Sequence, residues 1–84
     1  MVEPILLEVV SAERLVLREH VSRLTAPGSR GYLGVLPSHA PLITSLEPGV
    51  VTYTHEGQTK KLAVSGGFLE VYADKVTILA DTAE

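Results

Sequence analysis

Residues 68–80 read Phe-Leu-Glu-Val-Tyr-Ala-Asp-Lys-Val-Thr-Ile-Leu-Ala, which gives two apolar runs joined by the polar pair Asp74-Lys75. In the first run, Leu69 and Val71 fall on one face of an extended chain and Glu70 falls on the other. Such alternation is typical of a strand that packs on one face and meets solvent on the other. This stretch therefore predicts an antiparallel hairpin with one buried face.

The same kind of segment recurs along the rest of the chain. Val, Ile and Thr make up 21 of the 84 residues, and their branched Cβ atoms favour strands over helices. Residues 12–22 come closest to a helical pattern, but they carry too many polar side chains and are predicted to form a turn followed by a strand. Many short strands at regular spacing predict an antiparallel sandwich or a flattened barrel. The further apolar runs are residues 5–10, 16–24, 32–36, 42–46, 50–54 and 61–64.

Glycine-containing pairs mark the expected turns. Pro27-Gly28 and Pro48-Gly49 fit the central positions of type II turns, in which proline presets φ and glycine accepts a positive φ. Glu56-Gly57 is expected to close a tight hairpin. The run Ser65-Gly66-Gly67 predicts a β-bulge or a close backbone approach. It does not fit the turn that presents a nucleophilic serine, because Ala63 stands where that turn has glycine.

Length and composition limit the possible functions. A chain of 84 residues and 9.0 kDa is predicted to form one domain over residues 1–84. Its 45% hydrophobic and 20% charged residues are typical of globular proteins, and no apolar run approaches the roughly 18 residues of a membrane helix. A net charge of −3, with no basic cluster beyond Lys60-Lys61, argues against nucleic-acid binding. The lack of cysteine excludes disulfides and thiolate metal sites.

Candidate catalytic and metal-binding residues are few. His20, His39 and Asp81 could be combined into a triad, but their spacing is arbitrary and a small sandwich leaves little volume for a shielded pocket. The three histidines lack the spacing of a metal site, and His55 is expected to be exposed at a hairpin. We therefore expect no catalytic residue, no metal and no cofactor. A small hydrolase that uses Ser65 is a remaining alternative.

Lys75 supports a second alternative. Small β-sandwiches carry lipoate or biotin on a lysine at a hairpin tip, and Asp74-Lys75-Val76 resembles the Asp-Lys-Ala of lipoyl domains. Carrier domains place that lysine near the middle of the chain, whereas Lys75 is near the end. A solvated turn lysine is favoured, and a lipoyl or biotinyl carrier modified at Lys75 is the alternative function.

The loop at residues 34–42 favours an interaction module. Pro37 and Pro41 bracket Ser38-His39-Ala40 and stiffen a segment that would otherwise be mobile. Ordering a loop in advance lowers the entropic cost of docking onto a partner. In the absence of a catalytic constellation, the residues predict a small acidic β-sandwich that works by contact.

Three motifs together resemble those of one family: His-Ala-Pro-Leu at 39–42, Ser-Gly-Gly-Phe-Leu-Glu-Val at 65–71 and Ala-Asp-Thr-Ala at 80–83. Over nearly its whole length the chain resembles the N-terminal domain of the epsilon subunits of F-type ATP synthases, called delta in mitochondria. The resemblance implies an all-β, ten-stranded antiparallel β-sandwich of two five-stranded sheets. Family members usually continue into a C-terminal helical hairpin with inhibitory and, in some, ATP-binding roles, and that hairpin is expected to be absent here.

The resemblance also implies a role and a location. The chain would be a non-catalytic rotor subunit in the central stalk of a proton-translocating ATP synthase. It would bind the gamma subunit and rest on the ring of c subunits, so that proton flow is coupled to ATP synthesis or hydrolysis. It would be peripheral to the membrane through the complex, at the cytoplasmic face of a bacterial plasma membrane.

The resemblance assigns two surfaces to residues of this chain. Tyr32 stands where family members often have an acidic residue, so an aromatic or hydroxyl contact is expected there in place of an ionic one. Ser38 stands where glycine is usual, which restricts the loop. The surface expected to face the c-ring comprises Ser29, Arg30, Gly31, Tyr32, His39, Ala40 and Pro41. The surface expected to face gamma comprises Ser11, His39, Leu42, Ser65, Gly66 and Gly67.

Overall fold

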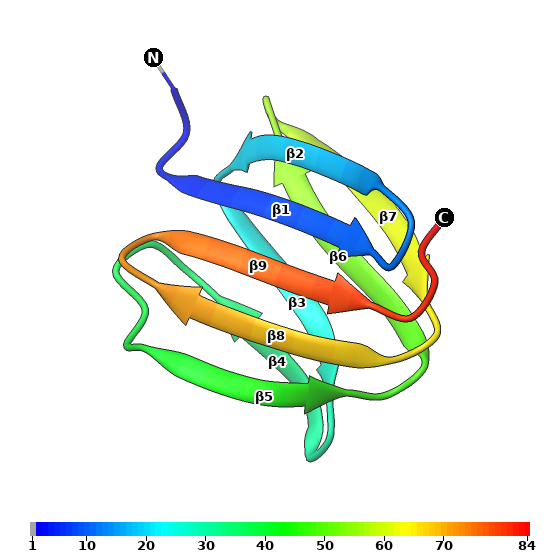
Figure 1. Cartoon of the computed structure of the whole chain (residues 1–84). Coiled ribbons are helices and arrows are strands. Elements are labelled where there is room, and N and C mark those ends of the chain that lie inside the picture. Colours follow the sequence, from blue (N-terminus) through cyan, green and yellow to red (C-terminus); the bar gives the residue numbers. More distant parts are fainter. Residues whose placement is uncertain (1) are drawn as a thin grey trace.

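The computed structural model describes residues 2–84, which form nine β-strands and no helix (Figure 1). The all-β class expected from the alternation of apolar and polar residues is confirmed. The described residues accordingly contain no helix long and apolar enough to cross a membrane. The strands are β1 (Ile5–Ser11), β2 (Leu15–Val21), β3 (Arg23–Gly28), β4 (Gly31–Val35), β5 (Leu42–Leu46), β6 (Gly49–His55), β7 (Gln58–Val64), β8 (Gly67–Tyr72) and β9 (Lys75–Ala80).

The strands lie in two layers that face each other across the core (Figure 1). One layer has the order β2-β1-β9-β8-β5, and the other has the order β4-β3-β6-β7. The layers are joined where β5 meets β3, through the single pair Gly28 and Leu46. The nine strands therefore form one sheet that folds over on itself.

The core lies between the layers and is made of the inward positions of each strand. On β8, Leu69 and Val71 are buried and Glu70 is exposed, as the alternation predicts. On β9, Val76 and Ile78 are fully buried in the same way. Tyr53 is the only residue of the core with a hydroxyl group, and no charged side chain within residues 2–84 is buried, so burial of apolar surface supplies the main driving force for folding.

The prediction of ten antiparallel strands in two five-stranded sheets is wrong in two details. The described residues form nine strands, and β1 pairs with β9 in parallel. Ala83 makes a single bridge to Val64, and Glu84 exchanges two backbone hydrogen bonds with Ala63, at 2.8 and 3.0 Å. The C-terminal residues thus lie along β7 as a tenth strand would, but the pairing is too short to form one.

The apolar run at residues 16–24 contains two strands, contrary to the expectation of one. β2 ends at Val21, β3 begins at Arg23, and Ser22 lies between them. The N–H of Ser22 donates to the carbonyl oxygen of Thr54 at 2.9 Å, where the chain passes from one layer to the other. The local pattern does not reveal this corner, because the apolar spacing continues across Ser22.

Neither Pro-Gly pair forms the expected type II turn. β3 runs through Pro27 and Gly28, and the turn follows at residues 29–30. Pro48 precedes β6, which begins at Gly49. Neither glycine has a positive φ, which a type II turn requires of its glycine. The reason for glycine at these positions is therefore not backbone conformation.

Two hairpins have two-residue turns with left-handed backbone conformation. Glu56 and Gly57 have φ of 51° and 79°, so the hairpin predicted there is confirmed. The β8–β9 turn consists of Ala73 and Asp74, with φ of 48° and 60°, in place of the expected Asp74-Lys75. Lys75 is the first residue of β9 and does not lie at the hairpin tip.

Ala73 gives a prediction about stability. Alanine has no interaction that offsets the cost of a left-handed conformation, whereas asparagine is favoured at the first position of such turns. The exchange Ala73→Asn is expected to raise the free energy of unfolding by about 1 kcal/mol, measured by urea denaturation. Ala40→Asn, at an exposed position without a positive φ, is the control and should give no gain. Equal effects of the two changes would contradict this account of the turn.

Candidate functional site

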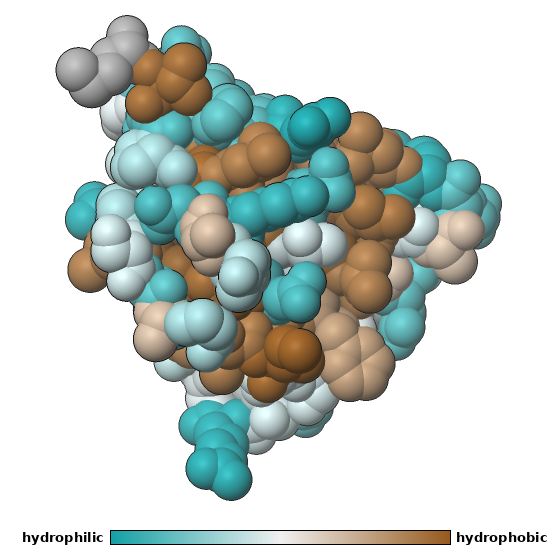
Figure 2. Space-filling view, turned by 60° about the vertical axis from the view of Figure 1, so that its left-hand side comes forward, coloured by the Kyte–Doolittle hydropathy of each residue, from teal (hydrophilic) through white to brown (hydrophobic). Residues whose placement is uncertain are grey.

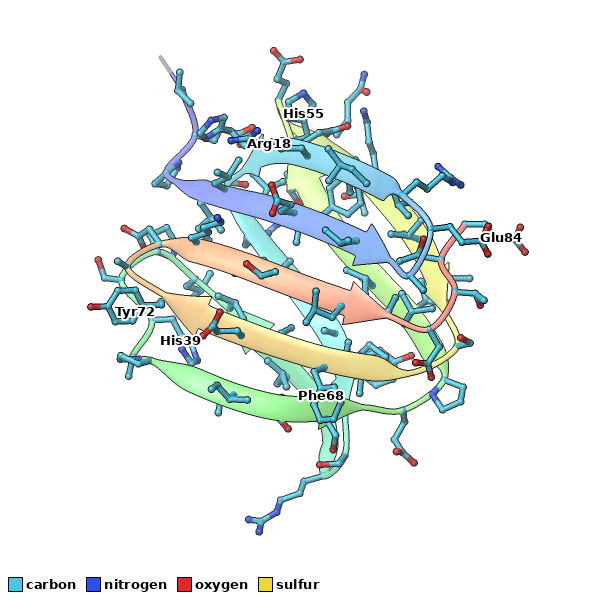
Figure 3. All side chains as sticks on the ribbon, in the orientation of Figure 1. Arg18, His39, His55, Phe68, Tyr72 and Glu84 are labelled. Atoms are coloured by element: carbon cyan, nitrogen blue, oxygen red, sulfur yellow. The ribbon has the colours of Figure 1, made fainter. Side chains whose placement is uncertain are left out.

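Three large apolar side chains lie exposed on the outer face of one layer. Ile43 of β5, Phe68 of β8 and Leu79 of β9 are 71%, 58% and 54% exposed. Phe68 lies directly opposite Leu79 in the β8–β9 pairing, and a shallow hollow is lined by all three residues. We call these three residues the apolar strip. Figure 2 shows hydrophobic side chains gathered along the right-hand side of the molecule, and Figure 3 labels Phe68 on this outer face.

The apolar strip exists because β8 and β9 each carry a large apolar side chain on the outward face as well as on the inward one. Leu69 and Ile78 point into the core and are fully buried, and their neighbours Phe68 and Leu79 point outward. A single exposed apolar side chain needs no explanation, but a contiguous group on a flat sheet is typical of a surface that a partner covers. Glu70 and Thr77 also line the hollow.

The residues expected to face gamma lie at the two ends of the apolar strip. Ser11 lines a second hollow together with Phe68 and Leu79. Leu42 lines a third hollow together with Ile43, at the opposite end of the strip. Leu42 itself is half-buried and packs against the core, so the outward side chain of β5 at this end is Ile43. Sequence reasoning did not assign the three residues of the strip to a partner surface. The signal that could have found them is the adjacent apolar pair at 42–43, 68–69 and 78–79, because one residue of each pair must point outward from a strand.

Ser65, Gly66 and Gly67 hold the end of the chain. The Ser65 hydroxyl accepts hydrogen bonds from the N–H and the hydroxyl of Thr82, at 2.9 and 2.8 Å. The carbonyl oxygen of Gly66 accepts from the N–H of Asp81 at 3.1 Å. At Gly67 a Cβ atom would collide with the backbone of β9, so the predicted close backbone approach is confirmed. These groups make contacts within the chain and close the β8–β9 end of the sandwich.

The turn expected to face the c-ring projects from the end of the β3–β4 hairpin, at the bottom of Figure 1. Ser29 and Arg30 are exposed, and Gly31 has a φ of 115° that favours glycine. The Ser29 N–H donates to the carbonyl oxygen of Ser45 at 3.1 Å. Tyr32 is exposed, but its hydroxyl bonds within the chain, to the N–H of Val50.

His39, Ala40 and Pro41 lie apart from that turn, because β4 runs between them. The His39 ring donates from Nδ1 to the carbonyl oxygen of Ala40 at 2.7 Å. The preceding residue, Ser38, has a φ of 65°, and its N–H donates to an Asp74 carboxylate oxygen at 2.6 Å. The loop is therefore fixed to the β8–β9 turn, and Figure 3 shows His39 and Tyr72 at the same end of the molecule. The seven residues assigned to one surface occupy two separate places.

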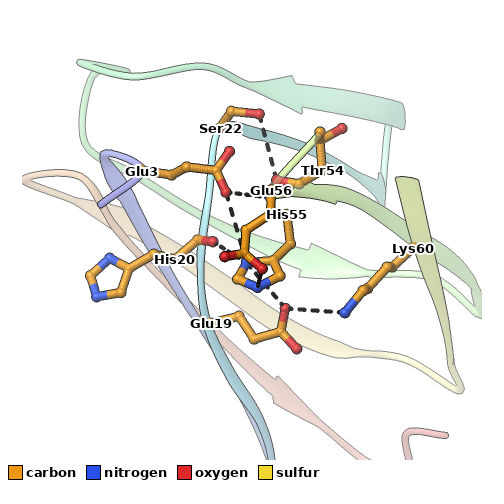
Figure 4. Close-up of polar contacts among 8 residues, drawn as sticks. All are labelled: Glu3, Glu19, His20, Ser22, Thr54, His55, Glu56 and Lys60. Atoms are coloured by element: carbon orange, nitrogen blue, oxygen red, sulfur yellow. Dashed lines mark hydrogen bonds and ion pairs between the residues drawn. The ribbon is translucent and has the colours of Figure 1, made fainter. Parts of the chain in front are cut away.

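A polar cluster around His55 closes the side of the sandwich where β2 faces β6 and β7 (Figure 4). His55 Nδ1 donates to the carbonyl oxygen of His20 at 2.7 Å and lies 3.5 Å from a Glu19 carboxylate oxygen. Glu3 accepts from the N–H of Glu56 at 2.6 Å, and His55 Nε2 lies 3.3 Å from a Glu56 carboxylate oxygen. The His55 side chain is only 25% exposed, so the expectation of a freely exposed histidine is wrong.

The cluster also affects the pKa of Tyr53, a core residue of β6. Burial, together with the negative charge of Glu19, raises the pKa of the Tyr53 hydroxyl above its ordinary value. Lys60 supplies the positive charge of the cluster, with its Nζ 3.9 Å from a Glu19 carboxylate oxygen. Opposite charges on β2 and β7 thus meet across the side where the two end strands of the sheet share no backbone ladder.

His55 therefore gives a second prediction about stability. His55→Ala removes the hydrogen bond to the His20 carbonyl oxygen. It also removes the imidazole ring that lies next to the carboxylates of Glu19 and Glu56, so the free energy of unfolding should fall by about 1–2 kcal/mol. His20→Ala is the matched control, because the His20 side chain makes no hydrogen bond or ion pair within the described residues. It should change stability by less than about 0.5 kcal/mol. Equal losses in urea denaturation would show that the cluster does not close the sandwich.

The structure does not bring the triad candidates together. His20 pairs with Leu6 at the start of β1, whereas Asp81 follows Ala80, which pairs with Ser11 at the end of β1. His39 lies in the loop between β4 and β5. Within residues 2–84, no group of three or more histidine and carboxylate side chains is arranged to hold a metal ion. What the described surface offers is an apolar sheet face with ordered loops at its ends.

Comparison with known proteins shows one family. The family model described as the β-sandwich domain of the ATP synthase delta/epsilon chain matches residues 5–84. The ATP synthase epsilon chain of Carboxydothermus hydrogenoformans is 57% identical over 84 residues, which are 100% of this chain and 63% of the relative. That of Desulfitobacterium hafniense is 56% identical over 78 residues, which are 93% of this chain and 59% of the relative. The chain thus spans less than two thirds of the length of these relatives.

Two solved structures have the same fold. A chain in the mitochondrial ATP synthase of Euglena gracilis, from a structure of OSCP, F1 and c-ring, superposes with a TM-score of 0.91 at 28% identity. The match covers 96% of this chain and 52% of the other. A chain from the central stalk and c-ring of the Tetrahymena thermophila mitochondrial ATP synthase superposes with a TM-score of 0.81 at 16% identity. That match covers 98% of this chain and 66% of the other.

Proposed function

The chain belongs to the family of the ATP synthase delta/epsilon chain β-sandwich domain, and from this premise we propose that it is a non-catalytic rotor component of an F-type ATP synthase. It binds the gamma subunit and the c-ring and transmits torque between them. The apolar strip is the observation that carries the proposal, because a contiguous group of exposed apolar side chains is typical of a surface that a partner covers. The chain works by shape and stiffness.

We propose that gamma covers the apolar strip. Ile43, Phe68 and Leu79 would form the apolar centre of the contact, and Ser11 and His39 would lie at its rim. An apolar centre surrounded by polar groups is the usual anatomy of a protein interface. The ordered backbone at Ser65 and at Gly66-Gly67 reduces the entropic cost of binding at one end of the strip.

The c-ring contact is proposed at the β3–β4 turn. Ser29, Arg30 and Gly31 project beyond the body of the sandwich, so they can reach the polar loops of a ring. Through this contact the chain would be peripheral to the membrane, at the cytoplasmic face in a bacterium. Because His39, Ala40 and Pro41 lie at the other end of β4, their contact with the ring would have to be a separate one.

A carrier role at Lys75 has less support. Lys75 is exposed, but it begins β9 and pairs within the sheet, whereas the turn itself is Ala73-Asp74. Co-expression with a lipoyl or biotinyl ligase, followed by intact mass, distinguishes the two functions. The rotor role predicts an unmodified mass, and addition to Lys75 would favour the carrier role.

Co-purification tests the rotor role. The tagged chain is co-expressed with its cognate gamma subunit, and a complex that survives size-exclusion chromatography is expected. Ser29→Cys is expected to crosslink to a cysteine placed in the c-ring loop of the assembled enzyme. Failure of the folded chain to bind gamma, with folding verified by circular dichroism, would contradict the proposal.

A further inference from the structure

Tyr32 reaches across its own sheet. It lies on β4 and is 64% exposed, yet its hydroxyl oxygen accepts a hydrogen bond from the N–H of Val50 at 3.2 Å. Val50 belongs to β6, and β3 lies between β4 and β6. The phenol ring therefore crosses a whole strand before its hydroxyl meets a partner.

The Val50 N–H needs this acceptor because the β3–β6 ladder ends before it. The last pair of that ladder is Thr25 with Thr52, and the same register continued would place Val50 opposite Pro27. The Pro27 carbonyl oxygen is already occupied, because it accepts from the N–H of Glu47 at 2.8 Å. An unpaired N–H is costly, and the phenol hydroxyl takes the place of the missing ladder acceptor.

Gly49 provides the space in which the hydroxyl sits. A Cβ atom on Gly49 would lie 2.8 Å from the Tyr32 hydroxyl oxygen and 2.8 Å from Cβ of Pro27. Such distances are shorter than side chains tolerate, and Gly49 has no positive φ that would otherwise require glycine. Glycine at this position thus leaves a notch for the phenol.

The brace matters because β4 is an edge strand. β4 pairs with β3 on one side only, and the described residues place no strand on its other side. The turn at residues 29–30 extends from β4 and is tied to the body by one backbone bond, from Ser29 to Ser45. The link from Tyr32 to β6 adds a contact outside the β3–β4 ladder, two residues beyond the turn.

We propose that Tyr32 is a positioning residue, which braces the projecting β3–β4 turn by holding its hydroxyl over Gly49 and against the Val50 N–H. The brace fixes the direction in which Ser29 and Arg30 point. Its role in contacting the c-ring rests on the proposed function, but the brace itself does not. The chain would thus present a stiff turn whose own tyrosine lies across β3 and bonds to β6.

Amide hydrogen exchange by NMR tests the brace in the folded chain. Tyr32→Phe removes only the hydroxyl, so exchange at the Val50 amide should rise about fivefold, as expected for one hydrogen bond. The backbone order parameters of residues 29–31 should fall at the same time. Tyr72→Phe is the matched control, because Tyr72 is 66% exposed and its hydroxyl has no hydrogen bond within residues 2–84. It should leave both readouts unchanged.

Gly49→Ala gives an independent test, because it closes the notch and leaves the tyrosine in place. It should produce the same two changes as Tyr32→Phe, and the double variant should differ little from either single one. Unchanged Val50 exchange in Tyr32→Phe, or a turn as ordered as in the parent chain, would overturn the proposal. In the assembled enzyme, the Ser29→Cys crosslink should lose yield when Tyr32→Phe is added. If Ser29→Cys does not crosslink even with Tyr32 in place, the result counts against the c-ring contact alone. Hydrogen exchange at the Val50 amide would still test the brace.

Discussion

Gly67→Ala is expected to shift the folding equilibrium so far that most molecules are unfolded at 25 °C. Gly67 has a φ of 134°, which side chains other than glycine rarely adopt. The added Cβ would collide with the carbonyl oxygen of Leu79 and lie 2.9 Å from Cα of Ala80. Both partners are backbone atoms of β9, so no side-chain rotation relieves the collision. The β8–β9 ladder would have to separate at this end.

The loss is expected to exceed about 4 kcal/mol, which places it among the most severe single substitutions. Domains of this size have only about 4–13 kcal/mol of stability in total. Urea denaturation followed by circular dichroism measures the change. Gly34→Ala is the matched control, because Gly34 has no atom near its Cβ position and no positive φ. It should leave the domain as stable as before or slightly more stable. A folded Gly67→Ala variant with near-normal stability would mean that β8 and β9 are not packed as described.

Phe68→Glu is expected to abolish binding to gamma while the domain stays folded. Phe68 is 58% exposed in the isolated chain, so its loss should cost only about 1 kcal/mol, from the pair with Leu79 and from strand preference. In the proposed complex the same position is covered by gamma. An unpaired carboxylate at an apolar interface costs several kcal/mol, so affinity should fall at least about a hundredfold.

Two controls separate charge from shape in this experiment. Phe68→Leu keeps the apolar character and should retain most of the affinity. Thr59→Glu adds the same charge on β7, away from the apolar strip, and should leave affinity unchanged. The measurement is titration calorimetry with purified gamma, supported by thermal unfolding of each variant. Undiminished binding by a folded Phe68→Glu variant would remove the apolar strip from the proposed interface.

The sequence pointed to loops at the ends of the apolar strip but not to the strip itself. The Ser-Gly-Gly and His-Ala-Pro motifs point to residues 65–67 and 39–41, because glycine and proline leave a local signal wherever the backbone is unusual. Phe68 and Leu79 give a weaker signal, because an apolar residue next to a core residue in the sequence is easily interpreted as another core residue. Ile43 follows half-buried Leu42 in the same way. Only the pairing of β5, β8 and β9 shows that these side chains share one outward face.

Tyr32 and Gly49 show a similar limit. From the sequence, Gly49 is one half of a Pro-Gly turn and Tyr32 is a residue of a partner surface. In the structure they lie next to each other across β3, 17 positions apart in the chain, and Gly49 begins β6 without forming the expected turn. Spacing along the chain cannot predict this contact, because it depends on which strands become neighbours.

By itself the sequence determined that the chain is all-β, where most strands lie, and which family it resembles. The class and the strand positions follow from the local alternation of apolar and polar residues, which acts over a few residues, whereas the resemblance rests on three short motifs. The tertiary structure decided the rest: the parallel pairing of β1 with β9, the corner at Ser22, and the single pair that joins the layers. It also decided which apolar side chains stay exposed. Strand order and the contacts between layers are set by packing between segments that are distant in the sequence, and local patterns do not predict which segments will pair.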